Sequence, residues 1–332
     1  MRTLFLLLVS LAAFVPVSAA PCTSATPDCT EWVHLGNQAQ ALVYRSYSLD
    51  TKNDKVTRAM IMVHGAGRDA DNYFRTALAA AFLAGALDDT VIIAPRFASN
   101  DGRGCRDTLA PNEINWSCSG DSWRSGGVSI SSNLTSYDLT DEVLRKLARK
   151  DVFPNLKAIV VAGHSAGGQY VTRYEMANAV HDKLGVPITY VVSNPSSYAY
   201  LEPERPGGTN NELRAFGDAR NCTTYDNWPY GLKNRTGYTA KIPDDQLKKQ
   251  LAERAVTYLL GELDILPLGG FDSSCPAMAQ GPTRLARGQT FAGYVIAKYK
   301  AQHKAIVVPL CGHNARCMFT AEVTLPILFP KL

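Results

Sequence analysis

A serine in a glycine-framed pentapeptide carries the strongest chemical signal in the sequence. Residues 163–167 have the sequence Gly-His-Ser-Ala-Gly and follow an apolar run that ends at Ala162. When such a serine joins a strand to a helix, the chain turns so sharply that the positions two residues away must be small. The turn exposes the hydroxyl at the start of the helix, where backbone amides favour negative charge. The spacing therefore predicts that Ser165 is a nucleophile for acyl transfer.

A second glycine-rich segment lies upstream, where residues 64–67 have the sequence His-Gly-Ala-Gly after an apolar run. Glycines let backbone amides approach a ligand closely, and acyl transfer needs such donors for the negative charge on the carbonyl oxygen. We expect the amides of Ala66 and Ala166 to form this oxyanion hole, with Gly67 as the alternative to Ala66. The other interpretation of the segment is a glycine-rich turn without a chemical role.

The serine hydroxyl needs a base, and His313 is the best placed of the six histidines. It follows the last apolar run by four residues, in a small loop that Cys311 and Cys317 could close. A base after the last strand suits the chain order nucleophile, acid, base. The remaining histidines are His34 before the first strands, His64 and His164 inside the two glycine-rich motifs, and His181 and His303, both expected at the surface.

The acid that orients the base should lie between Ser165 and His313 in the chain. Asp264 follows the apolar run 255–260 almost directly, where it can turn back toward the base. Asp272 is the fallback on a more distant polar stretch. Glu262 lies nearby, but side-chain alternation along an extended chain aims it differently from Asp264.

The elements that must position these residues alternate along the chain in the pattern of a mostly parallel sheet covered by helices on both faces. Apolar runs predict strands at residues 41–48, 58–64, 90–94, 157–162, 188–193, 255–260 and 305–309. Longer amphipathic stretches predict helices at 136–150, 166–184, 244–253 and 283–302.

Two long polar segments, residues 97–133 and 201–243, interrupt this alternation. Segments of this length without regular structure are usually functional, and both follow carboxyl ends of strands, where ligands bind in open parallel sheets. Their aromatic residues could form a substrate wall, with Trp116, Trp123 and Trp228 as the leading contacts and Tyr225, Tyr230 and Tyr238 beside them. The alternative is that these rings only pack each segment onto the body of the protein.

The first 19 residues predict a secretory signal peptide. Arg2 precedes an apolar run that begins at Leu4, and small residues follow at 17–20. We expect cleavage after Ala19 and a secreted, extracellular protein. The alternative, an uncleaved membrane anchor, is disfavoured because the apolar run is short for spanning a bilayer.

The eight cysteines all lie beyond this leader, and an even number in an exported chain predicts disulfides. Their spacings offer no metal-binding pairs, so no metal site is expected. Proximity in the sequence suggests the pairs Cys22–Cys29, Cys105–Cys118 and Cys311–Cys317, which leaves Cys222 and Cys275 for a long-range link. Glycosylation sequons occur at Asn115, Asn133, Asn221 and Asn234.

Composition bounds the remaining possibilities. The chain has 332 residues, 46% of them apolar, and 34 basic against 30 acidic side chains. The formal charge of +4 is too small and too evenly spread to indicate nucleic acid or an anionic membrane as the main partner. We expect one domain over residues 20–332, acting as a monomer.

The order Ser165, Asp264, His313, with residues 64–67 upstream, resembles the α/β-hydrolase superfamily over nearly the whole mature chain. The general layout is similar to secreted serine esterases and polyester depolymerase-like hydrolases. This resemblance implies an α/β-hydrolase fold with a mostly parallel central sheet, helices on both faces and a loop-rich cap insertion at 201–243. It implies a carboxylic ester hydrolase that acts on a small-molecule or polymeric ester without a cofactor. The segment 97–133 departs from the minimal fold by its length and its two cysteines.

Three rival functions remain open at the level of sequence. A peptidase or amidase would use the same three residues, and nothing in the sequence separates an amine from an alcohol leaving group. A lyase on the same fold would act without an acyl-enzyme. A non-catalytic binding protein usually lacks one of the three residues, and all three are present here.

Overall fold

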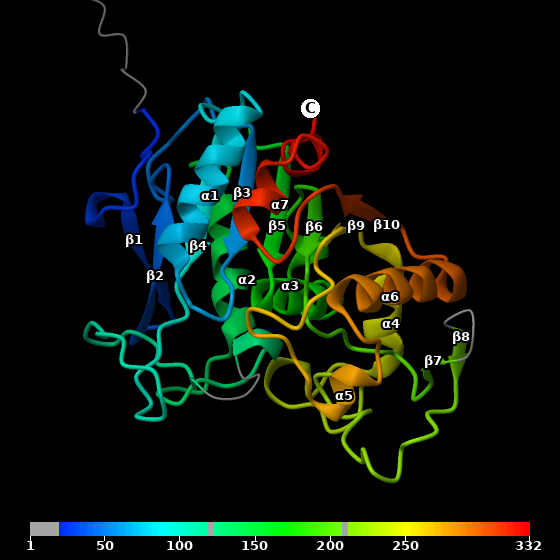
Figure 1. Cartoon of the computed structure of the whole chain (residues 1–332). Helices are drawn as coiled ribbons and strands as arrows, with labels where there is room; N and C mark the ends of the chain where they lie inside the picture. Colours follow the sequence, from blue (N-terminus) through cyan, green and yellow to red (C-terminus); the bar gives the residue numbers. More distant parts are fainter. Residues whose placement is uncertain (1–19, 119–122, 208–211) are drawn as a thin grey trace, which may run out of the picture.

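The computed structural model describes residues 20–118, 123–207 and 212–332, so the expected signal peptide lies outside the described residues. Its centre is an eight-stranded sheet with the strand order β1-β2-β4-β3-β5-β6-β9-β10 (Figure 1). The strands are β1 (Thr30–Leu35), β2 (Ala39–Arg45), β3 (Arg58–Val63), β4 (Thr90–Pro95), β5 (Ala158–His164), β6 (Ile188–Ser193), β9 (Val256–Gly261) and β10 (His303–Val308).

Six of these strands, from β4 to β10 in the sheet order, run parallel to one another, whereas β2 pairs antiparallel with both β1 and β4. The carboxyl ends of the parallel strands therefore meet at one edge of the sheet. The segments that carry residues 64–67, Ser165, Asp264 and His313 all leave the sheet at this edge. The mostly parallel sheet expected from the sequence is confirmed.

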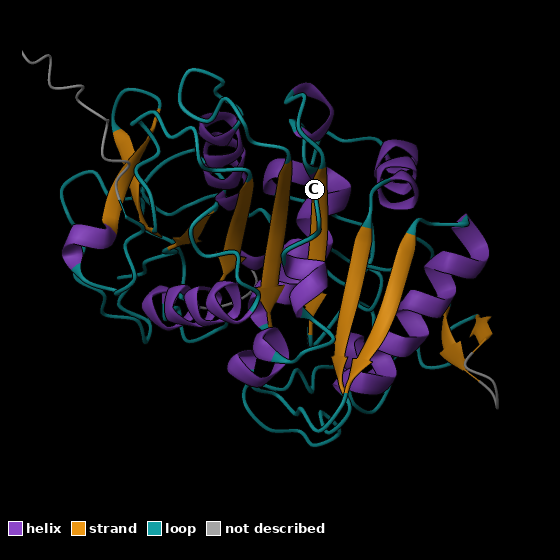
Figure 2. Cartoon of the chain, turned by 90° about the horizontal axis from the view of Figure 1, so that it is seen from above, coloured by secondary structure: helices purple, strands orange, loops and turns teal. Residues whose placement is uncertain are grey.

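Helices cover both faces of the sheet (Figure 2). Alternate strand residues enter two separate cores: Ile61 of β3 lies in one, and its neighbours Met60 and Met62 lie in the other. Such continuous burial explains why the central strands have apolar residues at every position. The first core is closed by α2 (Ser136–Leu147), α3 (Ala166–Ala177), α4 (Asp244–Glu253) and α6 (Arg284–Tyr299), and the second by α1 (Ala70–Leu83), α7 (Ala315–Thr320) and α8 (Leu325–Leu328).

Several element boundaries differ from the sequence-based expectation, each for a local reason. Helix α3 ends at Ala177 and does not continue to 184, because the Asn178 side chain accepts hydrogen bonds from the next free amides, those of Val180 and His181. Strand β1 and helix α1 were not anticipated. Strand β1 is half-exposed and mixed in polarity, and α1 is rich in alanine, so neither has a marked apolar period.

The long segments contain little regular structure in their described parts. Residues 97–133 contribute the short turn η2 (Trp123–Ser125), and residues 201–243 contribute the hairpin of β7 (Arg205–Gly207) and β8 (Glu212–Arg214) and the turn η4 (Gly237–Thr239). The Cys222–Cys275 disulfide links the second segment to the short helix α5 (Cys275–Met278). Two further short turns are η1 (Pro27–Cys29) and η3 (His181–Lys183).

All eight cysteines are paired in the structure, in the combination that the sequence spacing suggested. Two of the loops closed in this way lie next to functional candidates: Cys311–Cys317 encloses His313, and Cys105–Cys118 lies within the segment 97–133. Among the described residues, no helix has the length and apolarity needed to cross a membrane.

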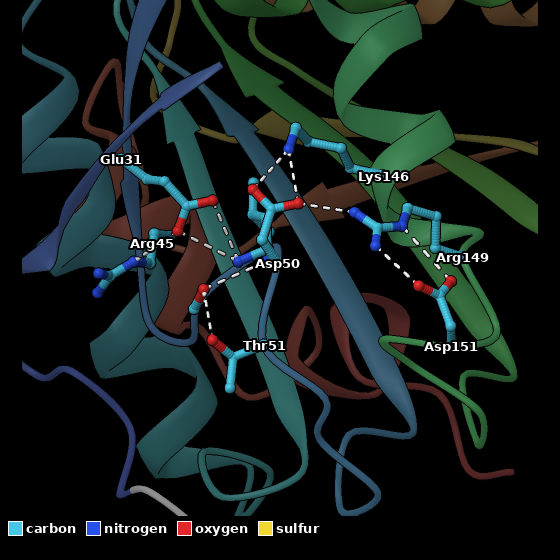
Figure 3. Close-up of polar contacts among 9 residues, drawn as sticks. Glu31, Arg45, Asp50, Thr51, Lys146, Arg149 and Asp151 are labelled. Carbon is cyan, nitrogen blue, oxygen red and sulfur yellow. Dashed lines mark hydrogen bonds and ion pairs between the residues drawn. The ribbon is translucent and has the colours of Figure 1, made fainter. Parts of the chain in front are cut away.

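A polar network attaches the loop after β2 to the end of α2 (Figure 3). Asp50 accepts hydrogen bonds from Lys146 at 2.8 Å and from Arg149 at 2.7 Å, and Arg149 also pairs with Asp151. The hydrogen bonds from Lys146 lower the pKa of Asp50. Because Asp50 and Arg149 are in contact with solvent, pairs of this kind contribute no more than about 1 kcal/mol each. Together they connect the loop after β2 to the residues at the end of α2.

Buried histidines make the stability of the fold sensitive to acid. His303 was expected at the surface but lies buried, between the Tyr258 hydroxyl at 2.9 Å and the Leu251 carbonyl at 2.7 Å. His64 is fully buried as well, where its Nε2 accepts a hydrogen bond from the Phe97 amide. Burial lowers the pKa of both side chains from 6.5 to about 4. The fold therefore holds them neutral.

We expect the free energy of unfolding to decrease as the pH falls from about 6.5 to about 4. Below pH 6.5 these histidines become protonated in the unfolded chain, whereas buried His64 and His303 stay neutral in the folded protein. Their contribution to stability is therefore fully present above pH 6.5 and is lost on acidification. Each histidine accounts for a loss on the order of 2 kcal/mol near pH 4.5. Thermal melts of the wild type and His303→Gln between pH 8 and 4.5 measure this. The variant should lose less stability across the window, and two parallel curves would contradict the expectation.

Candidate active site

Ser165 lies on a strained turn between β5 and α3. Its backbone has φ 58° and ψ −120°, and its amide donates to the Ser193 carbonyl at 2.9 Å. A Cβ atom at Gly163 would lie 2.3 Å from the Gly167 carbonyl oxygen, and one at Gly167 would lie 2.2 Å from the Val63 carbonyl oxygen. Both glycines are therefore required for the close packing of the turn. Strain of this kind persists only where the surrounding structure enforces it, as at functional sites.

His313 lies within hydrogen-bond distance of both Ser165 and Asp264. Its Nε2 is 2.9 Å from Ser165 Oγ, and its Nδ1 is 2.8 Å from Asp264 Oδ2. A proton on Nδ1, donated to the carboxylate, leaves Nε2 free to accept the serine proton. The loop that carries His313 is closed by the Cys311–Cys317 disulfide.

The Asp264 carboxylate is buried, with 2% of its surface exposed. One oxygen contacts His313, and the other lies 3.2 Å from a guanidinium nitrogen of Arg284. The two alternative acids point elsewhere. Asp272 accepts a hydrogen bond from the Tyr230 hydroxyl, and Glu262 accepts one from the Leu310 amide. The structure therefore brings Asp264, rather than either neighbour, to the base.

Asn194 connects the ends of two strands to the loop of His313. Its side-chain oxygen accepts from the Gly261 amide at 2.7 Å, and its side-chain nitrogen donates to the Gly312 carbonyl at 3.1 Å. Its backbone is left-handed, with φ 44°. This residue follows β6 directly and had no signal in the sequence, because its partners lie 67 and 118 residues away.

Residues 64–67 lie against the serine on the side of α1. Gly65 is closely packed, because a Cβ there would lie 2.7 Å from the Tyr73 hydroxyl and 3.7 Å from Ser165 Cβ. The buried His64 ring contacts the Gly65 carbonyl oxygen through its Nδ1 at 2.9 Å. Ala66 is exposed beside the serine, and Ala166 is the first residue of α3. Both amides expected to serve as oxyanion donors thus belong to segments that meet at Ser165.

A second histidine, His164, packs against His313. The His164 ring is buried and lies against His313, with ring centroids 4.6 Å apart, and its Nδ1 is 3.0 Å from the Tyr73 hydroxyl. Burial lowers the pKa of His164 well below its usual range, so the ring stays neutral beside the candidate base.

An open cavity of about 590 Å³ contains the serine and the histidine. Its walls are mainly polar or glycine. They are formed by Gly65, Ala66, Gly67, Asp69, Asn72, Tyr73, Thr76, His164, Ser165, Gly269, Gly270, His313, Asn314, Ala315 and Arg316. Within the described part of the chain, neither residues 97–133 nor residues 201–243 contribute to this wall.

The tryptophans expected to contact substrate lie elsewhere. Trp116 and Trp123 are buried in the first core, where both rings pack against Phe97. The Trp228 indole nitrogen donates to the Ser125 carbonyl at 3.0 Å, so this ring joins the two long segments. Trp116 and Trp123 are thus enclosed in the core, Trp228 is half-buried, and none of the three lines the cavity that contains Ser165. The burial of large rings stabilises loops that have little regular structure of their own, which was the alternative interpretation.

The fold and the geometry of this edge define the class of the protein. The profile of the alpha/beta hydrolase family matches residues 60–323, and the chain belongs to that family. Its sequence finds no match among curated proteins.

Solved structures share the fold. A poly(3-hydroxybutyrate) depolymerase from Bordetella parapertussis is 21% identical, with 89% of this chain and 85% of that chain covered and a TM-score of 0.60. Poly(aspartic acid) hydrolase-1 from Sphingomonas sp. KT-1 is also 21% identical, with 87% and 94% covered and a TM-score of 0.55. At this identity the likeness concerns the fold. The family assignment supports a hydrolase. The kind of bond that it cleaves has to be inferred from the residues at the site.

Proposed function

We propose that the protein is a secreted serine hydrolase that cleaves carboxylic esters through an acyl-enzyme on Ser165. The observation that carries the proposal is the continuous hydrogen-bonded chain from Ser165 Oγ through His313 to Asp264 at one end of an open cavity. The depolymerase among the structural neighbours, named for a polyester, supports an ester as the substrate.

In the first half of the proposed reaction, His313 Nε2 takes the serine proton while Oγ attacks the ester carbonyl carbon. Asp264 stabilises the imidazolium that forms. The amides of Ala66 and Ala166 donate to the oxyanion of the tetrahedral intermediate, and one such donor is typically worth about 3 kcal/mol. When the intermediate collapses, the C–O bond to the alcohol breaks, and His313 returns the proton to the leaving oxygen.

In the second half, a water molecule gives its proton to His313 and attacks the acyl-Ser165 carbonyl. Collapse of the second tetrahedral intermediate releases the carboxylic acid and returns the proton to Ser165. No cofactor takes part in this sequence of steps. We further propose that residues 201–243 form a cap-like insertion on a single domain of residues 20–332, and that the enzyme acts as a monomer.

Export from the cell is supported by the four disulfides, which persist in oxidising compartments. N-terminal sequencing of the protein purified from culture medium should begin at Ala20. Three sequon side chains, Asn133, Asn221 and Asn234, are exposed and open to glycosylation. The fourth, Asn115, is half-buried, and both its oxygen and its nitrogen are hydrogen-bonded to the Asn100 backbone, so we expect no glycan there.

A fluorophosphonate probe tests the proposal on the wild-type enzyme. The probe should label one residue, Ser165, and abolish hydrolysis in proportion to labelling, as measured by intact mass and peptide mapping. A panel of esters of increasing acyl length, run beside a peptide and an anilide, then separates esterase from amidase. Full activity after complete labelling, or hydrolysis of the peptide alone, would refute the ester hydrolase.

A further inference from the structure

A buried arginine lies directly behind the proposed catalytic acid. Arg284 is the first residue of α6 and has 1% of its surface exposed. Its Nε donates to Ser196 Oγ at 2.7 Å, one terminal nitrogen lies 3.2 Å from Asp264 Oδ1, and the other donates to the Gly269 carbonyl at 2.9 Å. A cation without access to water is costly unless its donors meet acceptors and a counter-charge. Asp264 supplies that charge.

We propose that Arg284 is a positioning residue that fixes the Asp264 carboxylate and extends hydrolysis to lower pH than Asp264 and His313 alone would allow. This inference rests on the proposed serine hydrolase mechanism. Arg284 does not touch the substrate and acts through Asp264.

The contacts of the Asp264 carboxylate indicate how Arg284 positions it. Asp264 Oδ2 faces His313 and Oδ1 faces Arg284, so the carboxylate is held from both sides in one orientation. The same guanidinium holds the carbonyl of Gly269, a cavity-lining residue with a left-handed φ of 56°. The Phe271 ring covers the guanidinium at 5.2 Å from its centroid. Arg284 thus ties the acid and one wall of the cavity to the same helix.

The charges around His313 indicate how Arg284 affects the pH range of hydrolysis. A carboxylate that faces an imidazole favours its protonated form, and a cation on the far side of that carboxylate weakens the effect. The reaction needs the neutral imidazole, so Arg284 preserves the active form at lower pH. The other titratable or charged groups near His313 are His164, which is held neutral, Tyr73, which is hydrogen-bonded to His164, Asp69 and Arg316, which line the same cavity, and Asp272, whose charge acts on Arg284. None of these groups pairs with the Asp264 carboxylate, whose charged or titratable partners among the described residues are His313 and Arg284.

The same helix provides a matched control. Arg287 is also fully buried, and it donates to the backbone carbonyls of Ser196, Gly281 and Asp272. It shares Ser196 and the Phe271 ring with Arg284, but it makes no hydrogen bond or ion pair with the Asp264 carboxylate. Replacing Arg287 with methionine therefore removes a buried cation of the same kind from the same helix and leaves the pair of Asp264 and Arg284 intact.

The test is the pH profile of kcat/KM for p-nitrophenyl acetate, with active sites counted by fluorophosphonate titration. The acidic limb of this profile reports the protonation of the base in the free enzyme. In Arg284→Met we expect the limb to move to higher pH by about one unit and the plateau to fall by about tenfold because Asp264 is less firmly held. In R284K, which keeps the charge, the limb should stay near the wild-type position. In R287M it should not move.

An acidic limb that stays in place or moves to lower pH in R284M would overturn the inference, as would an equal shift in R287M. If R284M does not yield folded protein, R284Q is the second neutral variant and carries the same expectation. The wild type separates the two proposals: without labelling at Ser165 the serine hydrolase itself fails, whereas labelling without a shift in the neutral variants refutes only the role of Arg284.

Discussion

Replacing Ser165 with alanine should lower kcat/KM for p-nitrophenyl acetate by about 10⁵-fold or more, the loss typical of removing a serine nucleophile. The substitution deletes one oxygen from a half-exposed side chain whose hydroxyl contacts His313. The fold should be retained, because the tight turn depends on the backbone and on Gly163 and Gly167. Steady-state kinetics and a thermal melt, measured on the same preparation, test both statements.

Ser193 provides the control for this variant. It ends β6 beside Ser165, and its buried hydroxyl has no hydrogen-bond partner among the described residues. Its carbonyl holds the Ser165 amide, but that backbone contact survives a side-chain change. Ser193→Ala should therefore hydrolyse the ester at the wild-type rate. If Ser165→Ala retained more than a few per cent of the activity, the nucleophile would have to be sought elsewhere.

Replacing Asp264 with asparagine should lower kcat by about 10⁴-fold, because the amide favours the wrong tautomer of His313 and no longer stabilises its charged form. This variant should also unfold more easily, unlike Ser165→Ala. Arg284 would remain buried without its anionic partner, which typically costs on the order of 3 kcal/mol. Kinetics at saturating ester and urea denaturation monitored by tryptophan fluorescence measure the two effects separately.

Asp272→Asn is the matched control, since Asp272 lies eight residues further along the same loop and was the alternative acid in the sequence. Its carboxylate accepts from the Tyr230 hydroxyl and the Ser274 amide and makes no contact with His313. Near-normal kinetics are expected in this variant. A greater loss of kcat in Asp272→Asn than in Asp264→Asn would mean that the loop rearranges in the working enzyme.

The parts of the proposed site that could be predicted from the sequence are those that depend on local geometry. Ser165 could be found because its turn admits only small residues two positions away, which leaves a pattern of five adjacent letters. His313 could be found because it follows the last strand and lies inside a short cysteine loop. The strands were visible because a sheet covered on both faces needs apolar residues at every position.

The tryptophans show where this reasoning fails. Trp116 and Trp123 were assigned to substrate because long segments at the carboxyl edge of a sheet often bind ligands, but the rings face the interior. An aromatic residue in a loop can pack inward or line a pocket, and its sequence neighbours do not distinguish the two. The same is true of His303, which looked like a surface residue and lies between Tyr258 and Leu251.

The sequence alone indicated the class of the protein, suggested its disulfide pairs and placed Ser165, Asp264 and His313 in order, because periodicity, short loops and tight turns involve near neighbours. Only the folded chain decided which charges surround the acid. Arg284 and Asn194 are ordinary residues at the ends of elements, and they matter because a parallel sheet gathers the carboxyl ends of distant strands at one edge. Contacts between residues that lie far apart in the chain leave no local pattern, so a single sequence does not reveal them.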